Sequence, residues 1–472
     1  MNPVVVDRIR HEANAKLDPK RKSELGQFLT PYGIAAFMAS LFATGTSPGI
    51  LLDAGAGVGS LTLAASRKLA LERIEAWEVD PVLRSYLQVN LQELGVPYEI
   101  HAKDFIHDSV DRIQFDIGTR FTYAILNPPY KKISSRSQHR KILSDLGIET
   151  VNTYTAFLAL AILQMQERGQ IVAIIPRSFC NGPYYKSFRK LLLKQCAIDR
   201  IHVFGSRSDA FHEDGVLQEN IIVKLTRGKP QGAVSLSFSQ DADFIDLEQR
   251  MVGFEEIVKP NDQEIFFHIP TEDSLKSQTL FSHSLSELGL EVCTGPVVDF
   301  RLKNWWSARP HLGTVPLLYP HHFTGKGLQY PKEHKKPNAL IRSPEVDKWL
   351  MPSGFYVVVK RFSSKEERRR VVAYVVSPSD LDSQWIGFEN HWNVLHIHKR
   401  GLDKKLAKGL ACFLNTTHLD SYFRSFSGHT QVNATDLRNM KYPSHEQLEE
   451  LGATYSFQMS QEDIDASLDR LA

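Results

Sequence analysis

The sequence contains few cysteines and no long apolar run. Its four cysteines lie far apart and form no CxxC pair, so we expect free thiols rather than a disulfide framework or a zinc site. No stretch approaches the roughly 20 apolar residues of a membrane-spanning helix. The first residues include charged side chains and lack the apolar core of a signal peptide. We therefore expect a cytoplasmic protein that does not contact a membrane.

The net charge is also low, but the charges are unevenly distributed. The formal net charge is +2, yet residues 300–440 contain 22 Lys and Arg against 11 Asp and Glu. The rest of the chain is correspondingly acidic. A basic region of this kind is compatible with a solvated surface or with a polyanionic partner such as nucleic acid. Charge alone leaves both interpretations open.

Apolar runs alternate with helical patterns over residues 50–226. Such alternation predicts an α/β domain with a mostly parallel sheet covered by helices on both faces. Two successive runs, 198–204 and 220–226, have no helical pattern between them and predict an antiparallel edge. Beyond this region the composition becomes irregular, and later it is rich in Trp, His and basic residues. We expect three parts: a catalytic domain at 1–230, a bridging segment at 231–284, and a second domain at 285–472.

A glycine-rich turn separates the first expected strand from the first expected helix. It reads Asp-Ala-Gly-Ala-Gly-Val-Gly from Asp53, with glycines at Gly55 and Gly57. Glycine allows a sharp turn and a close approach of the backbone to a ligand. Glu78 ends the next expected strand, where an acid can accept hydrogen bonds from both ribose hydroxyls. This unit predicts a nucleoside cofactor, either a dinucleotide or S-adenosylmethionine.

A tetrad with a specific chemical meaning, Asn127-Pro128-Pro129-Tyr130, follows the apolar run at 123–126. The two prolines stiffen the backbone and present the Asn127 amide oxygen beside the Pro128 carbonyl oxygen. Both atoms accept hydrogen bonds, and an exocyclic amino group has two protons to donate. Accepting both protons would localise the nitrogen lone pair and direct it at an electrophilic methyl group. Tyr130 offers a flat face for a base removed from its helix, and the tetrad therefore favours methyl transfer from S-adenosylmethionine.

With these motifs the chain resembles the gamma class of N6-adenine DNA methyltransferases from type II restriction–modification systems. The segment Gly-Gln-Phe-Leu-Thr-Pro at 26–31 is similar to the family's GQFxTP segment, which closes over the methionine part of the cofactor. The resemblance implies a Rossmann-like S-adenosylmethionine-dependent fold and a C-terminal α+β target-recognition domain.

The same resemblance assigns roles to individual residues of the catalytic half. It implies that the flipped base and its amino group are bound by Asn127, Pro128, Pro129, Tyr130 and Phe211, with Phe211 on the face opposite Tyr130. It implies that S-adenosylmethionine is bound by Thr30, Pro31, Asp53, Gly55, Gly57, Glu78, Asp104 and Phe105. In this assignment Asp104 and Phe105 hold the cofactor's adenine ring.

Two basic segments are candidates for DNA contact. Residues 131–141 follow the tetrad and contain five Lys and Arg and no acid, which predicts phosphate contacts near the target base. A second cluster begins behind an apolar run at 355–360. Either segment could instead be a solvated surface loop. The residues that we expect to contact DNA are Lys131, Lys132, Arg136, Lys360 and Arg361, and no residue spacing indicates a metal site.

The expected function is site-specific methylation of adenine N6 in double-stranded DNA, which would protect the site from a separate restriction endonuclease. Methylation of cytosine N4, of a ribosomal RNA base or of a protein glutamine needs the same two acceptors, so the tetrad leaves these alternatives open. The GQFxTP segment and the basic second half favour DNA. The intact tetrad speaks against a DNA-binding module without catalysis. No nuclease is expected ahead of residue 26, and one chain that carries both halves could act as a monomer.

Overall fold

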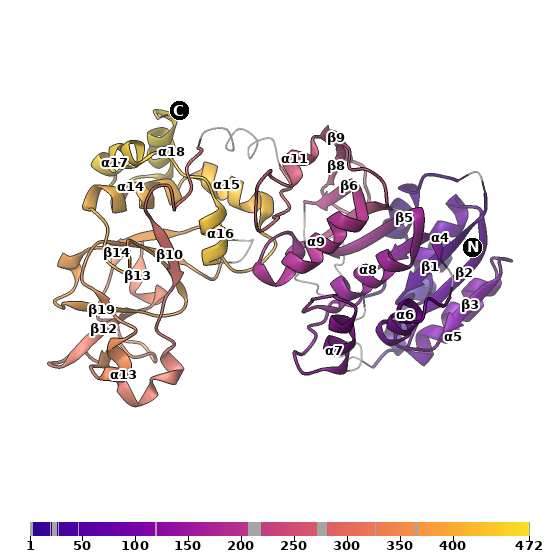
Figure 1. Ribbon diagram of the computed structural model, residues 1–472, viewed down its shortest axis with the longest axis horizontal. Coiled ribbons are helices and arrows are strands. Elements are labelled where there is room, and N and C mark those ends of the chain that lie inside the picture. Colours follow the sequence, from indigo (N-terminus) through magenta and orange to yellow (C-terminus); the bar gives the residue numbers. More distant parts are fainter. Residues whose placement is uncertain are drawn as a thin grey trace. The chain divides into compact units, whose positions relative to one another are not determined.

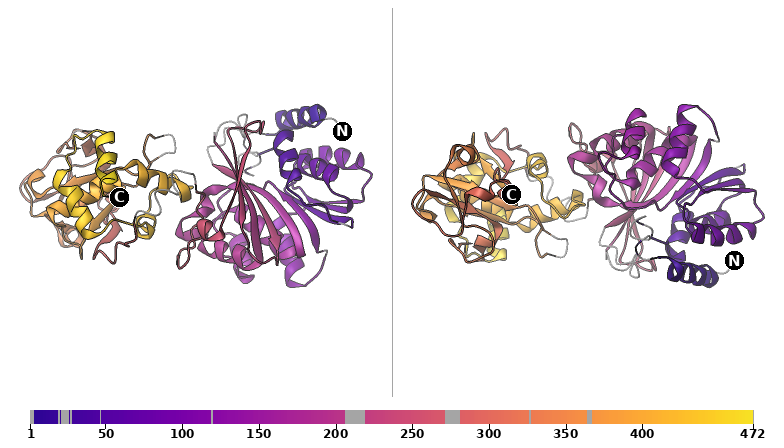
Figure 2. Two further views of the ribbon diagram at one scale, coloured as in Figure 1. Left: turned by 90° about the horizontal axis from the view of Figure 1, so that it is seen from above. Right: turned by 90° about the horizontal axis from the view of Figure 1, so that it is seen from below.

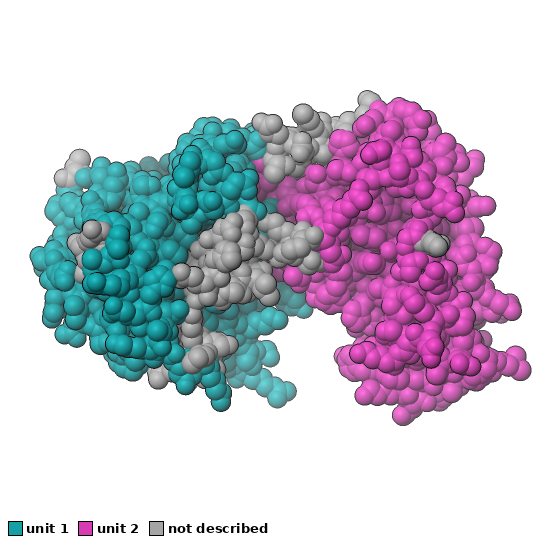
Figure 3. All heavy atoms as spheres, turned by 180° about the vertical axis from the view of Figure 1, so that it is seen from behind, with its two compact units in different colours: residues 1–267 teal, residues 268–472 magenta. Residues whose placement is uncertain are grey.

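The computed structural model describes ten stretches of the chain, which form two compact units, Met1–Phe267 and His268–Ala472. Figure 3 colours the two units. The described residues are 3–18, 20, 26, 28–45, 47–118, 120–205, 219–270, 281–325, 327–363 and 367–471. Within these stretches, no helix is long and apolar enough to cross a membrane.

A nine-stranded sheet forms the centre of the first unit, with the order β3-β2-β1-β4-β5-β7-β6-β8-β9 (Figure 1). Its strands are β1 (Gly49–Ala54), β2 (Leu71–Trp77), β3 (Tyr98–His101), β4 (Phe121–Leu126), β5 (Met165–Pro176), β6 (Cys196–Phe204), β7 (Asn220–Arg227), β8 (Val234–Ser239) and β9 (Glu248–Val252). The first five strands are parallel, whereas β7 pairs antiparallel with both β5 and β6. The predicted mostly parallel sheet with antiparallel strands towards one edge is therefore confirmed.

Helices lie on both faces of this sheet (Figure 2). One group of helices that pack against one another comprises α1 (Pro3–Lys16), α3 (Tyr32–Ser40), α4 (Ser60–Lys68) and α5 (Pro81–Gln92). The other group comprises α6 (Phe105–Gln114), α7 (Gln138–Asp145), α8 (Thr153–Gln164) and α9 (Lys186–Gln195). Local sequence explains several helix starts, since Asp80 accepts hydrogen bonds from two amides of α5 and Asp104 from two amides of α6.

The first part of the expected bridging segment at 231–284 belongs instead to the sheet of the first unit. Strand β8 pairs parallel with β6, and β9 pairs antiparallel with β8, so both strands extend the sheet of the first unit. Val234, Leu236 and Phe238 alternate with serines, which is the pattern of a partly buried strand. The short helix α11 (Phe254–Ile257) follows, and the boundary between the units falls after Phe267 rather than at residue 230.

The second unit combines small sheets with helices. One sheet has the order β10-β20-β17-β18, a second β11-β15-β12-β19-β16, and β13 pairs with β14. The strands are β10 (Glu291–Thr294), β11 (Trp306–Ser307), β12 (Thr314–Leu318), β13 (Phe323–Thr324), β14 (Gly327–Leu328), β15 (Ala339–Ile341), β16 (Met351–Pro352), β17 (Tyr356–Lys360), β18 (Ala373–Val376), β19 (Trp385–Phe388) and β20 (Trp392–His396).

The helices of the second unit are α13 (Pro344–Asp347), α14 (Lys404–Leu414), α15 (Thr417–Phe426), α16 (Ala434–Asn439), α17 (His445–Thr454) and α18 (Gln461–Asp469). Two of them approach each other unusually closely. A Cβ on Gly409 of α14 would lie 1.7 Å from Leu448 O, and one on Gly452 of α17 would lie 1.8 Å from Lys405 O. The contact between these helices therefore requires glycine at both positions.

All four cysteines are free thiols, and Cys180, Cys196 and Cys412 are buried. Burial raises the pKa of each of these three to about 12. Cys293 is partly exposed, and its partial burial raises its pKa to about 11. The thiolate form is therefore scarce at neutral pH.

Candidate functional site

A cavity of about 330 Å³ opens in the first unit, where β1, β2, β3 and β4 end. Ligands of open α/β sheets bind at this carboxyl edge, and the volume is in the range of small-molecule sites. Residues of several segments line it, among them Gly26, Phe28, Leu29, Gly55, Gly57, Trp77, Glu78, Asp104, Phe105, Asn127, Pro129, Lys131, Lys132 and His139.

The glycine loop after β1 is fastened to the end of β2. Gly55 N donates to Trp77 O at 2.9 Å, and Gly57 N donates to Glu78 Oε2 at 2.9 Å. The φ angles of Gly55 and Gly57 are +78° and +59°, in the region that glycine adopts without strain. A Cβ on Gly57 would also lie 2.9 Å from Leu29 Cδ2. Position 57 thus needs glycine for its backbone conformation and for contact with the 26–31 segment.

Glu78 lies on the cavity wall and is only 4% exposed. Its Oε1 accepts from Asp80 N at 2.7 Å, while its Oε2 accepts from Gly57 N. Burial raises the pKa of Glu78, and these two amide hydrogen bonds oppose that shift. Because each carboxylate oxygen has two lone pairs, the side chain can accept further hydrogen bonds from a ribose diol.

Asp53, at the end of β1, is fully buried and lies outside the cavity lining. Its Oδ2 accepts from Thr62 Oγ1 at 2.6 Å, whereas its Oδ1 has no partner in the described part of the chain. Burial and, to a smaller extent, the negative charge of Glu78 raise the pKa of Asp53 to about 7, although the hydrogen bond from Thr62 opposes this shift. The protonated form of Asp53 is therefore favoured relative to a carboxyl group in water.

Asp104 and Phe105 begin α6 on another part of the cavity wall. Asp104 Oδ1 accepts from Ile106 N at 2.9 Å and from His107 N at 3.1 Å. Its Oδ2 lies 3.2 Å from His139 Nε2. Burial favours a higher pKa for Asp104, but the hydrogen bond with His139 contributes to a net lowering and raises the pKa of His139. An acid beside a buried aromatic ring suits a heteroaromatic ring that carries an amino group.

The residues at this edge fit S-adenosylmethionine. Gly55, Gly57, Glu78, Asp104 and Phe105 lie together on the cavity wall, whereas Asp53 lies outside it. Two other residues predicted to bind the cofactor, Thr30 and Pro31, are not part of the lining. Pro31 precedes α3, and its carbonyl oxygen accepts from Ala35 N at 3.0 Å.

The tetrad begins directly after β4, with the Asn127 side chain on the cavity wall. Asn127 Nδ2 donates to Phe28 O and to Thr30 Oγ1, each at 2.9 Å. The Tyr130 hydroxyl donates to Asn127 Oδ1 at 3.0 Å. Burial raises the pKa of Tyr130, so its hydroxyl stays protonated, and Ile174 O at 3.3 Å is a second acceptor for its proton. Because Phe28 O can only accept, its contact with Nδ2 defines the orientation of the carboxamide.

Two backbone atoms of the tetrad, Pro129 O and Tyr130 N, also form hydrogen bonds with neighbouring segments. Thr153 Oγ1 donates to Pro129 O, and Tyr130 N donates to Gly26 O at 3.3 Å. Among the described residues, none donates to Pro128 O. The Tyr130 ring centre lies 5.6 Å from that of Phe28. The stretch 206–218, which includes the predicted base-stacking residue Phe211, lies outside the described residues.

The two basic segments differ in their surroundings. Lys131, Lys132 and Arg136 are exposed, and the two lysines also line the cavity. In the second unit, the Lys360 ammonium lies 5.7 Å from the ring centre of Tyr374. Arg361 Nη1 donates to Asn390 O at 3.1 Å, so part of this guanidinium is used within the fold.

The sequence interpretation missed two contacts at the site. Phe28 lies in the 26–31 segment, but its role is that of a backbone acceptor for Asn127, and such a contact has no sequence signature. His139 lies in the basic segment, where no residue pattern indicates a contact with Asp104. In both cases, the contact depends on loops that meet only in the folded chain.

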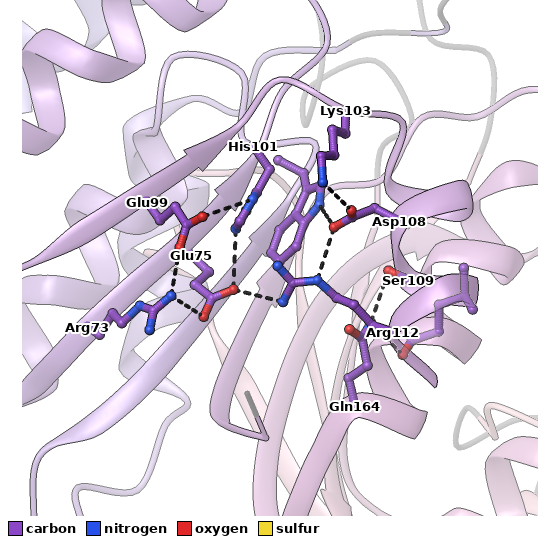
Figure 4. Close-up of polar contacts among 11 residues, drawn as sticks. Arg73, Glu75, Glu99, His101, Lys103, Asp108, Ser109, Arg112 and Gln164 are labelled. Atoms are coloured by element: carbon purple, nitrogen blue, oxygen red, sulfur yellow. Dashed lines mark hydrogen bonds and ion pairs between the residues drawn. The ribbon is translucent and has the colours of Figure 1, made fainter. Parts of the chain in front are cut away.

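Behind the cavity wall, a network of charged residues lies on β2, β3 and α6 (Figure 4). Its centre is Glu75, which is fully buried. Glu75 lies 2.9 Å from Arg73 Nη2, 3.3 Å from His101 Nε2 and 3.0 Å from Arg112 Nη1. Several positive or polar partners thus compensate the buried carboxylate.

The same network holds Trp77 at the end of β2. Trp77 Nε1 donates to Asp108 Oδ2 at 3.0 Å. The indole stacks on His101 with ring centres 4.1 Å apart, and the Arg112 guanidinium lies 4.9 Å from the indole centre. Because Trp77 O accepts from the glycine loop and Glu78 comes next in the chain, this network supports the backbone from which the cavity wall is built.

Comparison with known proteins shows near full-length relatives. The type II methyltransferase M.BsuBI of Bacillus subtilis is 50% identical over 466 residues, which cover 95% of this chain and 93% of that protein. The type II methyltransferase M.PstI of Providencia stuartii is 41% identical over 475 residues, which cover 96% of this chain and 94% of that protein.

A protein family agrees with these relatives, and a solved structure shares the fold. The Eco57I restriction-modification methylase family matches residues 69–211, a range that contains Glu78, Asp104 and the tetrad. A cryo-EM structure of a DrdV–DNA complex has a TM-score of 0.50 at 13% identity, covering 92% of this chain and 57% of that chain. The second likeness extends to the fold alone.

Proposed function

Because the chain belongs to the type II methyltransferases of restriction–modification systems, we propose that it transfers the methyl group of S-adenosylmethionine to N6 of an adenine in double-stranded DNA. The observation that carries this proposal is the held side chain of Asn127, a residue of the cavity wall whose NH2 group donates to Phe28 O and Thr30 Oγ1 and which precedes Pro128 in the chain. S-adenosylmethionine supplies a methyl group attached to positively charged sulfur. A separate restriction endonuclease would be the functional partner of this activity.

In the proposed mechanism, Asn127 Oδ1 and Pro128 O accept the two protons of the adenine amino group. Their hydrogen bonds localise the lone pair on the nitrogen and match the positive charge that develops there as the methyl group arrives. Asn127 is only 9% exposed, and acceptors fixed in such a site stabilise developing charge more effectively than water does. Glu78 and the glycine loop hold the cofactor, so that positioning supplies most of the acceleration.

The target adenine must leave the duplex before it can reach these acceptors. Unstacking a base costs a few kcal/mol, which stacking in the pocket and phosphate contacts would offset. We assign the stacking to Tyr130 and Phe211. Phosphate contacts are assigned to the exposed Lys131, Lys132 and Arg136, and, in the second unit, to Lys360 and Arg361. One chain would carry both functions and act as a monomer.

The test is incubation of the purified protein with labelled S-adenosylmethionine and unmethylated plasmid DNA, followed by digestion to nucleosides. We expect the label in N6-methyladenine, and we expect Asn127→Ala to lose it while binding S-adenosylmethionine within about threefold of the unaltered protein. Label in N4-methylcytosine would retain the mechanism and change the base. Label in RNA or protein, with none in DNA, would refute the proposed substrate.

A further inference from the structure

The orientation of the Asn127 carboxamide determines whether an acceptor or a donor meets the substrate. Rotation by 180° about the last side-chain bond exchanges the oxygen and the NH2 group. With the oxygen towards the substrate, the side chain accepts an amino proton, whereas with the NH2 group there it repels that proton. An Asn at this position therefore works only if its surroundings select one orientation.

One contact selects the orientation, and a second contact supports it. Both protons of the Asn127 NH2 group are used, one towards Phe28 O and one towards Thr30 Oγ1. In the reversed orientation, Oδ1 would face Phe28 O, which is an acceptor only, and this hydrogen bond would be lost. The Tyr130 hydroxyl lies 3.0 Å from Asn127 Oδ1 and 3.3 Å from Ile174 O and can donate its one proton to either. The amide oxygen has two lone pairs, so at least one is left for an incoming amino proton.

We propose that Thr30 is a positioning residue for methyl transfer, because its hydroxyl accepts the second NH2 proton of Asn127 and, together with Phe28 O, holds the amide with the oxygen towards the substrate. Thr30 is 5% exposed and is not part of the cavity lining. Its hydroxyl contacts the Asn127 side chain at 2.9 Å. The 26–31 segment therefore acts on the reacting nitrogen through Asn127. This inference rests on the proposed function, in which Asn127 binds the target amino group.

The role predicts a change in the rate of transfer with little change in cofactor affinity. Thr30→Val keeps the shape of the side chain and removes the acceptor, which leaves one buried N–H of Asn127 without a partner. An unpaired buried donor is costly, so the reversed and disordered amide conformers gain population. We expect a loss of about 10- to 100-fold in the single-turnover rate. The dissociation constant for S-adenosylmethionine should change by less than about threefold.

Matched variants separate positioning from general damage to the fold. Thr30→Ser retains the hydroxyl and should restore the rate to within about threefold of the unaltered protein. Thr226→Val removes another buried threonine hydroxyl, which donates to Asp199 Oδ2. Thr226 pairs with Gln170 near the start of the regular β5 ladder, away from the carboxyl edge. Thr226→Val should therefore lower the melting temperature without slowing methyl transfer.

The decisive measurements are single-turnover rates and cofactor dissociation constants for these variants, with melting temperatures as a check on folding. Three results would each overturn the inference: full activity of Thr30→Val, equal losses in Thr30→Val and Thr30→Ser, or a loss confined to cofactor affinity. If the unaltered protein labels cytosine N4 instead of adenine, the proposed base is wrong, but the Thr30 comparison is made on that product and remains decisive.

A second variant keeps the inference testable if Thr30→Val does not fold. Asn127→Asp replaces the NH2 group by an oxygen that faces Phe28 O, so a proton must be present on the carboxyl group for this contact to form. We expect Asn127→Asp to transfer methyl groups faster as the pH falls from 9 to 6, relative to the unaltered protein at each pH. A constant ratio over this range would contradict the proposed role of the contacts to Phe28 and Thr30.

Discussion

Replacement of Arg112 by Met tests whether the charge network behind the cavity supports the first unit. The Arg112 side chain is 16% exposed and joins two acids: its Nη1 lies 3.0 Å from Glu75 Oε2 and its Nε 3.0 Å from Asp108 Oδ2. Methionine has a similar length and can pack against Trp77, so the substitution removes the charge and the hydrogen bonds with little change in volume.

The expected cost follows from the burial of the partners. Removal of one member of a buried ion pair costs about 3–5 kcal/mol, because the other charge remains buried without compensation. Glu75 is fully buried but keeps Arg73 and His101 as partners. We therefore expect a loss of stability at the lower end of this range, about 3 kcal/mol. Arg8→Met is the control, since Arg8 and Glu12 are 68% and 55% exposed. Such a pair contributes at most about 0.5 kcal/mol.

Hydrogen exchange of the amides of β2, followed by mass spectrometry, measures the free energy of opening of this part of the first unit. We expect Arg112→Met to lower it by about 3 kcal/mol and Arg8→Met by less than about 0.5 kcal/mol. Adding Glu75→Gln to Arg112→Met should recover at least about 1 kcal/mol, because the buried carboxylate that lost one of its cationic partners is then neutral. A loss below about 1 kcal/mol in Arg112→Met, or no recovery in the double variant, would refute the reasoning.

Three further predictions concern the cofactor, the pH and DNA. Gly57→Ala, which forces a side chain into a positive φ and against Leu29, should weaken S-adenosylmethionine binding at least tenfold in calorimetry. The pKa of Asp53 is raised from 3.8 to about 7 in the folded state, so the folded state retains this proton longer and stability falls as the pH rises. Urea titrations should show that the free energy of unfolding falls between pH 5 and pH 8 by about 2–3 kcal/mol more in the unaltered protein than in Asp53→Asn. An equal pH dependence of the two proteins would contradict the raised pKa. The double variant Lys132→Ala/Arg136→Ala should reduce the slope of log K against log salt for DNA by about 1.8, whereas an unchanged slope would remove both residues from the interface.

The central sheet could be predicted because its strands are buried on both faces and read as apolar runs between helical patterns. Strand β4, for example, contains the apolar run at 123–126 that precedes the tetrad, and its observed bounds are Phe121–Leu126. Strands β8 and β9 were missed because they come after the strand–helix alternation. In β8 serines alternate with apolar residues, and β9, the edge strand, is mostly polar.

The site could be predicted where its residues are contiguous in sequence at the end of a strand. The glycine loop after β1 and the tetrad after β4 are of this kind, since the chain must reverse there at the carboxyl edge of the sheet. The partner of Thr30 could not be predicted, because its contact with Asn127 joins positions 97 residues apart and depends on the rotation of one amide. Phe211 stays a prediction.

The low reactivity of the four native thiols has a practical consequence for following the two units during a reaction. Maleimide reagents attack the thiolate, and burial raises the pKa of Cys180, Cys196 and Cys412 to about 12 and that of Cys293 to about 11. Two exposed cysteines, introduced one in each unit, would therefore accept fluorescent dyes without prior removal of the native ones. Energy transfer between such dyes would report the separation of the units as cofactor and DNA are added.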